Sequence, residues 1–212
     1  MENTANRIAL RGSLLSLPAF SHENHGRRFY RFSLEVQRLS GAADILQIVA
    51  DEALLNKLDL SGGEMLYVEG QVRSFNSKLE SGRKLIISVF ADELIACDGG
   101  PVNEVELAGA ICKEPIYRRT PLGREICDVM LAVNRPYRRT DYLPCILWGK
   151  TAQEASQLPI GARLRLTGRL QSREYIKTLD SGSERRTAYE ISAISAAPEP
   201  YCDTGASESD DP

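Results

Sequence analysis

Aromatic and basic side chains alternate along one stretch of the chain, from Val133 to Lys150 (VNRPYRRTDYLPCILWGK). Tyr137 follows a strand-like run and is flanked by arginines, and Trp148 ends a second run just before a Gly-Lys pair. An aromatic ring can stack on another flat ring system such as a nucleobase, and guanidinium groups bind phosphate oxygens. These residue types therefore predict contact with a polyanion that carries flat rings.

The alternation of the second run predicts which of its side chains face outward, because successive side chains of a strand point to opposite faces. One set is apolar and suits a core: Leu143, Cys145 and Leu147. The other set is then expected outside: Tyr142, Pro144, Ile146 and Trp148. Further along, Tyr175 lies with Arg173 and Lys177 in a predicted hairpin, and two arginines return on its partner strand. The predicted contact residues are Arg118, Arg119, Arg135, Tyr137, Arg138, Arg139, Tyr142, Trp148, Lys150, Arg173, Tyr175, Lys177, Arg185 and Arg186.

Some of these residues have a purely structural alternative. Trp148 is the only tryptophan, and a lone tryptophan is often part of a core. Tyr142 can cap a barrel, and Arg118 and Arg119 can simply solvate a loop. Tyr137 beside three arginines is hard to bury, which favours contact with a ligand.

The chain is an internal repeat. Ten residues of the first half recur 97 positions later, among them Arg38 and Asp44, which match Arg135 and Asp141. After one added residue the spacing becomes 98, as for Gly70 and Gly168. The register indicates two copies of one domain of roughly 95 residues.

Each copy is predicted to be all-β with one short helix. Alternation of period two dominates both halves, with a glycine marking a bend or bulge at Gly70 and at Gly168. A helix is expected over 152–158, opened by a capping box at Thr151, and another over 52–58, capped by Asp51. Two late strands in each copy flank polar tips, at 77–82 and 179–183. Five short strands with this helix close best as an OB-fold, a five-stranded barrel.

The two copies differ in the residues that could bind a ligand. Where the second copy has Tyr137, Tyr142 and Tyr175, the first has Ser40, Ile45 and Ser77. The position of Trp148 falls near 50–51, without an aromatic residue, and 138–139 matches Gly-Ala. The first copy is therefore expected to serve assembly or present a partner surface, while the second binds the ligand.

Charge and composition limit the function. Residues 1–100 hold 11 Lys and Arg against 13 Asp and Glu, residues 101–196 hold 15 against 11, and 197–212 hold none against 5. A basic second domain beside an acidic tail suggests a polyanion ligand. Five cysteines without a C-x-x-C pair suggest reduced thiols in the cytosol. The sequence contains no run of 18 apolar residues, so no membrane span is expected. His22 and His25 lack a third metal ligand at usable spacing, no phosphate loop is present, and neither a catalytic set nor a cofactor is expected.

At this point the sequence resembles a known family. Residues 103–196 are similar to the DNA-binding domain of bacterial single-stranded DNA-binding proteins, through 131–136 (LAVNRP), 147–152 (LWGKTA), 168–175 (GRLQSREY) and 184–190 (ERRTAYE). Residues 6–96 resemble the family weakly. The resemblance implies stacking by Tyr137, Tyr142, Trp148 and Tyr175, and an arrangement like that of tandem-barrel members, which form dimers with four barrels.

The expected organisation is thus a degenerate OB-fold over 1–96, a linker over 97–102, a second OB-fold over 103–197 and a disordered acidic tail over 198–212. The expected function is sequence-independent binding and protection of single-stranded DNA in replication, recombination and repair, without catalysis, in the cytoplasm at the nucleoid. The family's tail ends in a hydrophobic residue that recruits repair and replication proteins; here a terminal Phe is absent, so this route is not implied. The alternatives are a replication-restart or plasmid-borne accessory factor that acts through protein contacts, and an RNA-binding module.

Overall fold

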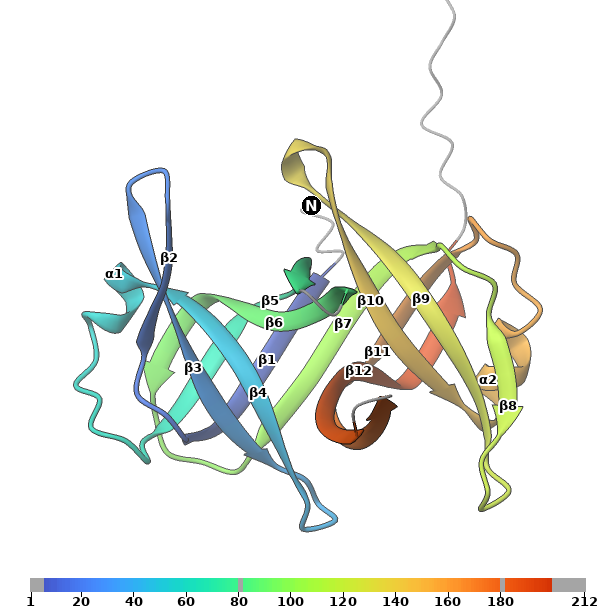
Figure 1. The fold of residues 1–212 in the computed structure, drawn as a ribbon, viewed down its shortest axis with the longest axis horizontal. Coiled ribbons are helices and arrows are strands. Elements are labelled where there is room, and N and C mark those ends of the chain that lie inside the picture. Colours follow the sequence, from blue (N-terminus) through green and yellow to red (C-terminus); the bar gives the residue numbers. More distant parts are fainter. Residues whose placement is uncertain (1–5, 80–81, 180–181, 200–212) are drawn as a thin grey trace, which may run out of the picture.

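The computed structural model describes residues 6–79, 82–179 and 182–199 and consists of two β-barrels side by side (Figure 1). The first contains β1 (Asn6–Leu14), β2 (Ala19–Asn24), β3 (Arg27–Gln37), β4 (Ala43–Asp51), α1 (Glu52–Leu55), β5 (Met65–Leu79) and β6 (Gly82–Ala96). The second contains β7 (Val102–Ile111), β8 (Ile116–Arg119), β9 (Glu125–Arg135), the 3-10 turn η1 (Pro136–Arg138), β10 (Arg139–Trp148), α2 (Gly149–Ala155), β11 (Arg163–Leu179) and β12 (Gly182–Pro198).

All strands form one continuous sheet that closes twice. Its order is β2-β3-β4-β6-β5-β1-β7-β11-β12-β10-β9-β8, and the pairings β3–β1 and β7–β9 close the two barrels. The barrel strands and the helix between the third and fourth of them make each half an OB-fold, as the sequence predicts. Each half also has a short strand that was not predicted, β2 or β8, paired with the outer edge of β3 or β9. No described helix is long and apolar enough to cross a membrane.

Each barrel is filled by the inward-facing residues of its alternating strands. From Phe32 in β3 and from Cys127 in β9 the burial pattern repeats every second residue, as expected for a strand with one face in the core. The largest fully buried side chains are divided between the barrels: Ile8, Leu10, Phe32, Leu34, Leu46, Ile48 and Leu66 in the first, Leu107, Ile111, Leu131, Leu143 and Leu147 in the second.

The predicted irregularity at two glycines is confirmed. The pairing of β5 with β6 shifts register between Glu69 and Gly70, and that of β11 with β12 shifts between Thr167 and Gly168. At each glycine an added Cβ would clash with a backbone carbonyl of the neighbouring strand, so only glycine permits this approach. The two bulges let long strands bend around the barrels.

The two helices show one correct cap and one wrong one. The Asp51 carboxylate accepts a hydrogen bond from the Ala53 N–H at 2.7 Å, which confirms it as the cap of α1. The predicted capping box at Thr151 is wrong: α2 begins at Gly149, three residues before the predicted start at Ala152, and the Thr151 hydroxyl donates to the Trp148 carbonyl at 3.1 Å. Gly149 adopts a φ of 56°, and this left-handed conformation starts the turn without a side-chain cap.

The last strand runs further than the predicted start of the tail. Pro198 belongs to β12, and the Glu199 carboxylate pairs with Arg163 at 3.0 Å and with Arg165 at 2.7 Å. The rest of the predicted tail, 200–212, lies outside the described residues, as do the hairpin tips at 80–81 and 180–181.

The barrels are joined by antiparallel pairing of β1 with β7. The register runs from Asn6 opposite Leu107 to Arg11 opposite Val102. Asn6 and Leu10 of β1 are equivalent in the repeat to Asn103 and Leu107 of β7. In the ladder Asn6 lies opposite Leu107 and Leu10 lies opposite Asn103, so the two copies are related by a local two-fold axis. The repeat in the sequence is therefore also a symmetry of the structure.

Buried aspartates hold the barrels together on both sides of this axis. Asp44 is fully buried, pairs with Arg38 and accepts the backbone N–H of Ser172 at 2.7 Å. Asp141, also fully buried, pairs with Arg135 at 3.0 Å and accepts the backbone N–H of Ser74 at 2.7 Å. Each aspartate thus binds an arginine of its own barrel and a strand of the other.

Arg73 breaks the symmetry of this contact. Arg73 adds a second guanidinium 3.5 Å from Asp141, whereas Gln171 stands at the equivalent place near Asp44. Burial and the nearby charge of Arg135 lower the pKa of Arg73.

We expect Asp141→Ala to lower the free energy of unfolding by about 3 kcal/mol, because it leaves two largely buried guanidinium groups without a counter-charge. The estimate is at the low end of the range for buried pairs because Arg73 and Arg135 keep 20% and 23% of their side chains exposed. Urea unfolding measures the change. The exposed Asp59→Ala serves as the control, with an expected change within about 0.5 kcal/mol. Equal stability of Asp141→Ala and the wild type would contradict this role.

Candidate nucleic-acid interface

The outward face of β10 carries two of the predicted aromatic residues. Tyr142 is 45% exposed and Trp148 is 36% exposed, while Leu143, Cys145 and Leu147 of the other face are buried. The predicted division of the strand into an inner and an outer face is therefore confirmed for these residues. Ile146, expected outside, is only 8% exposed and lies where β10 pairs with Ser192 of β12.

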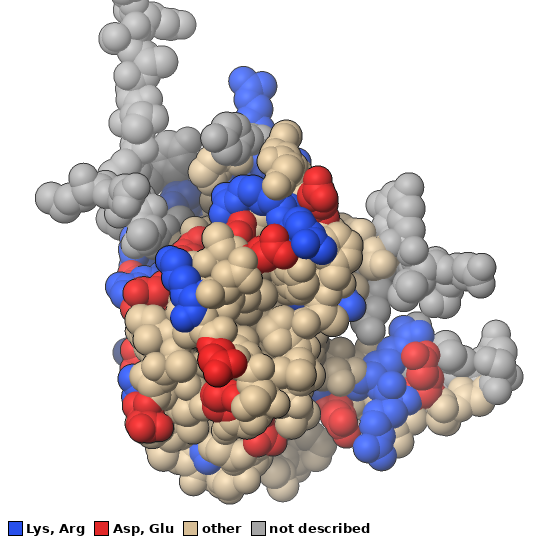
Figure 2. Space-filling model, turned by 90° about the vertical axis from the view of Figure 1, so that its left-hand side faces the viewer, with Lys and Arg blue, Asp and Glu red and all other residues tan. Residues whose placement is uncertain are grey.

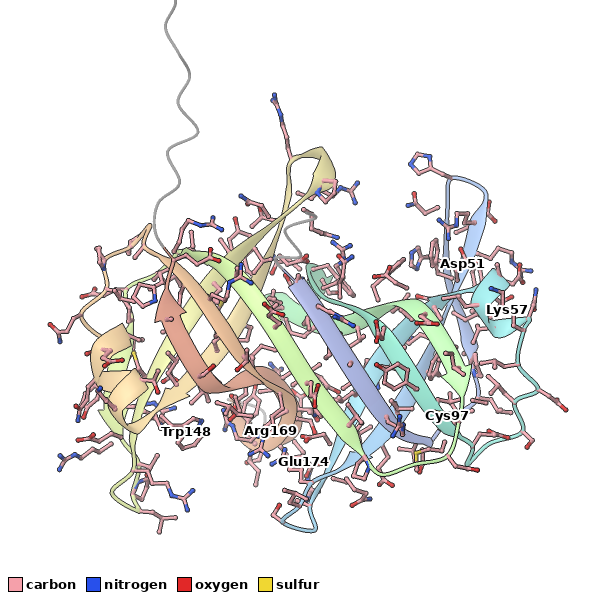
Figure 3. All side chains as sticks on the ribbon, turned by 180° about the vertical axis from the view of Figure 1, so that it is seen from behind. Asp51, Lys57, Cys97, Trp148, Arg169 and Glu174 are labelled. Atoms are coloured by element: carbon pink, nitrogen blue, oxygen red, sulfur yellow. The ribbon has the colours of Figure 1, made fainter. Side chains whose placement is uncertain are left out.

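Trp148 lies at the rim of a basic hollow. Its indole N–H donates to the Ser192 hydroxyl at 3.1 Å, which fixes the ring while leaving part of it open. The hollow, of about 450 Å³, is also lined by Arg38, Arg124 and Arg169. Figure 3 shows Trp148 and Arg169 on the same side of the second barrel. A fixed ring among guanidinium groups can stack on a base while its phosphates are held nearby.

Tyr175 lies on the β11–β12 hairpin and is 37% exposed. The Arg173 guanidinium lies 5.9 Å from the centre of its ring, and Arg186 faces it across the hairpin. The ring therefore remains available on a strand rich in positive charge.

Most of the predicted cations are paired with carboxylates. The pairs are Arg118 with Asp128 at 2.6 Å, Arg119 with Glu125 at 3.0 Å, Lys150 with Glu154 at 3.4 Å, Arg173 with Glu190 at 3.8 Å, Arg185 with Glu174 at 3.2 Å and Arg186 with Glu184 at 2.7 Å. Solvent-exposed ion pairs contribute only about 0–1 kcal/mol. The exposed members of this set can therefore exchange a carboxylate for a phosphate at little cost.

Arg135 differs from the rest of the predicted cations. Its partner Asp141 is fully buried, and its own side chain is 23% exposed. The structure thus places Arg135 in the contact between the barrels, and the exposed cations next to it are Arg138 and Arg139.

The β9–β10 hairpin presents these two arginines at its turn. Arg138 ends η1 with a φ of 55°, and both side chains are exposed. Within the described ranges neither forms an ion pair within 4.0 Å. The side chains of Tyr137 and Lys177, predicted contacts beside them, lie outside what the structure describes.

An acid sits among these cations. Glu190 of β12 is largely buried, and burial raises the pKa of its carboxyl above the ordinary value of 4.5, while the charges of Arg173, Arg118 and Arg38 oppose the rise. Asp128 adds to the rise. The charge of this surface therefore depends on the protonation of Glu190.

The equivalent face of the first barrel lacks these features. Ile45 replaces Tyr142 and is 43% exposed, and Ala50, near the position of Trp148, is buried. Figure 2 views the molecule from the side of the first barrel, where basic and acidic residues are intermingled over a largely uncharged surface.

Sequence reasoning missed two parts of this surface. Arg169 was not selected, although its alternation with buried Leu170 in β11 indicates an outward position. Arg124, in the loop between β8 and β9, was not selected either, yet it lines the same hollow. Only the folded structure shows that both meet at Trp148, since they come from separate strands or loops.

Two closed OB-fold barrels define a type of fold that binds oligonucleotides or oligosaccharides, and the second barrel carries exposed aromatic residues on the outer face of β10. The model of the single-strand binding protein family matches residues 102–197. Single-stranded DNA-binding protein B of Bacillus subtilis is 38% identical over 80 residues, which are 34% of this chain and 71% of that protein. The chain belongs to the single-strand binding protein family.

Other comparisons agree with this assignment. Single-stranded DNA-binding protein 2 of Listeria innocua is 35% identical over 101 residues, covering 44% of this chain and 62% of that protein. Against several further curated relatives the match spans about half of their length. The wild-type single-stranded DNA-binding protein from Thermus aquaticus shares the fold, with a TM-score of 0.75 at 23% identity over 92% of both chains.

Because the pKa of Glu190 is raised in the folded state, ionisation of its carboxyl opposes folding. The protonated carboxyl stabilises the fold at pH values below the ordinary pKa. This stabilisation is lost as the pH rises through the pKa of the folded state. We expect Glu190→Gln to remove this loss, so that its stability relative to the wild type increases with pH from 4.5 upward. Urea unfolding at a series of pH values gives the difference, and carbon NMR follows the carboxyl itself. Glu174→Gln, on the exposed partner strand, is the control. Titration of Glu190 at or below 4.5 would contradict the expectation.

Proposed function

We propose that this chain binds single-stranded DNA without regard to sequence and protects it during replication, recombination and repair. The observation that carries the proposal is the set of three exposed rings on the second barrel, Tyr142, Trp148 and Tyr175, of which Trp148 and Tyr175 lie beside arginines. Every base has a flat face, so stacking on such rings tolerates any sequence, while cations follow the phosphates. Membership of the single-strand binding protein family and the names of its relatives support the same ligand.

The two barrels have different tasks in this proposal. The second, 103–197, holds the strand through its rings. The first, 1–96, lacks rings at the equivalent positions and serves mainly to build the assembly. Each stacked base contributes about 1–3 kcal/mol, so the absence of three or four rings removes most of this type of affinity. The protein acts as a binding protein without catalysis, in the cytoplasm at the nucleoid.

We further propose a homodimer with four barrels. The outer face of the sheet around β1 and β7 carries charges of both signs that a second copy can complement, among them Arg7, paired with Glu69 at 3.1 Å, and Glu106, paired with Arg165 at 2.7 Å. Replication and repair proteins are further candidate partners, which this surface does not identify.

Oligo-dT is expected to quench the fluorescence of Trp148, the only tryptophan, because a stacked base contacts its ring. Trp148→Ala and Tyr175→Ala should each weaken binding of labelled oligo-dT roughly tenfold, measured by fluorescence anisotropy. Phe20→Ala removes a more exposed ring from the first barrel (54% exposed) that lines neither the hollow at Trp148 nor the hollow between the two barrels, and it should leave affinity unchanged. A tryptophan that does not respond to oligo-dT, with unchanged affinity of both variants, would favour a protein-binding accessory role. Parallel titrations with oligo-U test RNA as the ligand.

Affinity for oligo-dT should fall as salt rises, because each neutralised phosphate releases counterions, with a slope of about −0.7 per phosphate on logarithmic axes. Arg138→Ala and Arg139→Ala should each make this slope shallower by about that amount. Lys57→Ala, an exposed cation of the first barrel that lines neither hollow, is the control and should leave the slope unchanged. Affinity that does not change with salt would contradict the role of the arginines.

A further inference from the structure

A large hollow lies between the two barrels. It has a volume of about 760 Å³ and is lined by strands of both halves, β2 to β6 of the first and β10 to β12 of the second. Tyr175, Arg185 and Arg186 enter it from the β11–β12 hairpin, and Arg31 and Phe75 enter it from the first barrel. The proposed strand-binding surface therefore continues onto residues that the repeat comparison does not select.

Phe75 is held at this hollow by the contact between the barrels. It directly follows Ser74, whose backbone N–H is bound by Asp141 and whose hydroxyl accepts the Tyr142 N–H at 2.7 Å. Two consecutive anchors thus fix β5 against β10 beside Tyr142. Phe75 itself is 53% exposed, so its ring is positioned by the backbone and yet not used in a core.

The symmetry of the repeat explains why Phe75 was overlooked. Its equivalent in the second barrel is Arg173, and no aromatic residue proposed for stacking stands at that place. Ser77 is the residue equivalent to Tyr175, and its lack of a ring suggests a first barrel without stacking groups. The ring two residues earlier escapes that comparison.

Cations in the same hollow indicate the kind of ligand. Arg31 on β3 forms no ion pair within 4.0 Å among the residues that the structure describes, and it faces the hollow together with Arg185. A single exposed phenylalanine on a surface is ordinary. One that shares a hollow with Tyr175, Pro144 and arginines of both barrels has the composition of a single-strand binding surface.

We infer that Phe75 is a base-stacking residue and Arg31 a phosphate contact, by which the first barrel extends the DNA path of the second. This inference rests on the proposed function. A single DNA strand that leaves Tyr175 crosses the hollow onto Phe75. One protein chain therefore binds a longer segment of DNA than the second barrel covers. The first barrel then contributes through this hollow and not through the positions equivalent to Trp148 or Tyr175.

The test uses the full chain and labelled oligo-dT of increasing length. Phe75→Ala and Phe75→Leu should each lower affinity about tenfold for oligonucleotides long enough to cross the hollow, with little change for short ones. Phe75→Tyr keeps a ring and should retain wild-type affinity. Phe20→Ala is the matched control, and Arg31→Ala should make the salt slope shallower by about 0.7. Because Phe75 is half exposed, these variants are expected to keep the wild-type urea unfolding curve.

A second readout locates the contact directly. Oligo-dT with 5-iododeoxyuridine at successive positions should cross-link to Phe75 on irradiation, as identified by mass spectrometry. If wild-type Trp148 is quenched while Phe75→Ala binds long oligo-dT as tightly as the wild type, this inference is wrong and the proposed function stands. If oligo-dT neither quenches Trp148 nor binds, the proposed function itself fails.

Discussion

The contact between the two copies, built on β1–β7 pairing and two buried aspartates, governs the rest of the structure. Asp44 and Asp141 each bind an arginine of one barrel and a backbone N–H of the other. A buried carboxylate is costly unless it is fully paired, so this geometry holds only when the barrels are docked in one way. Docking in turn fixes β5 beside β10 and sets the hollow between the barrels.

The internal symmetry leaves the outer faces free to diverge. Matching residues such as Asn6 and Asn103 bind the backbone in the same manner, Asn6 to Val72 and Asn103 to Leu170. These polar positions maintain the strand pairing and recur in both copies. The rings and arginines on the outer face of β10 make no such contacts and appear in only one copy. Duplication thus supplies a rigid frame, and the exposed rings of β10 distinguish one half of it from the other.

Much of the fold could be predicted because its signals are local. Alternation in β10 separates Leu143 from Tyr142, and the glycine at 70 or 168 marks a bulge. The edge strands β2 and β8 were missed because their residues are almost all exposed and show no alternation. The start of α2 was misplaced because a capping-box pattern at Thr151 competes with the left-handed Gly149, which begins the helix earlier.

The site was harder to predict because charge pairing is a property of the folded chain. Arg135 and Arg138 look alike in the sequence, yet one faces a fully buried aspartate and the other is exposed without a paired carboxylate among the described residues. The two arginines differ in whether a buried carboxylate pairs with them. An arginine in an exposed ion pair exchanges its carboxylate for a phosphate at little cost, whereas breaking a buried ion pair destabilises the fold. Phe75 and its neighbour Ser74 differ in a similar way, because the Ser74 backbone N–H is bound by the buried Asp141 in the contact between the barrels. Its own ring remains exposed beside the arginines of both barrels, where a strand can reach it.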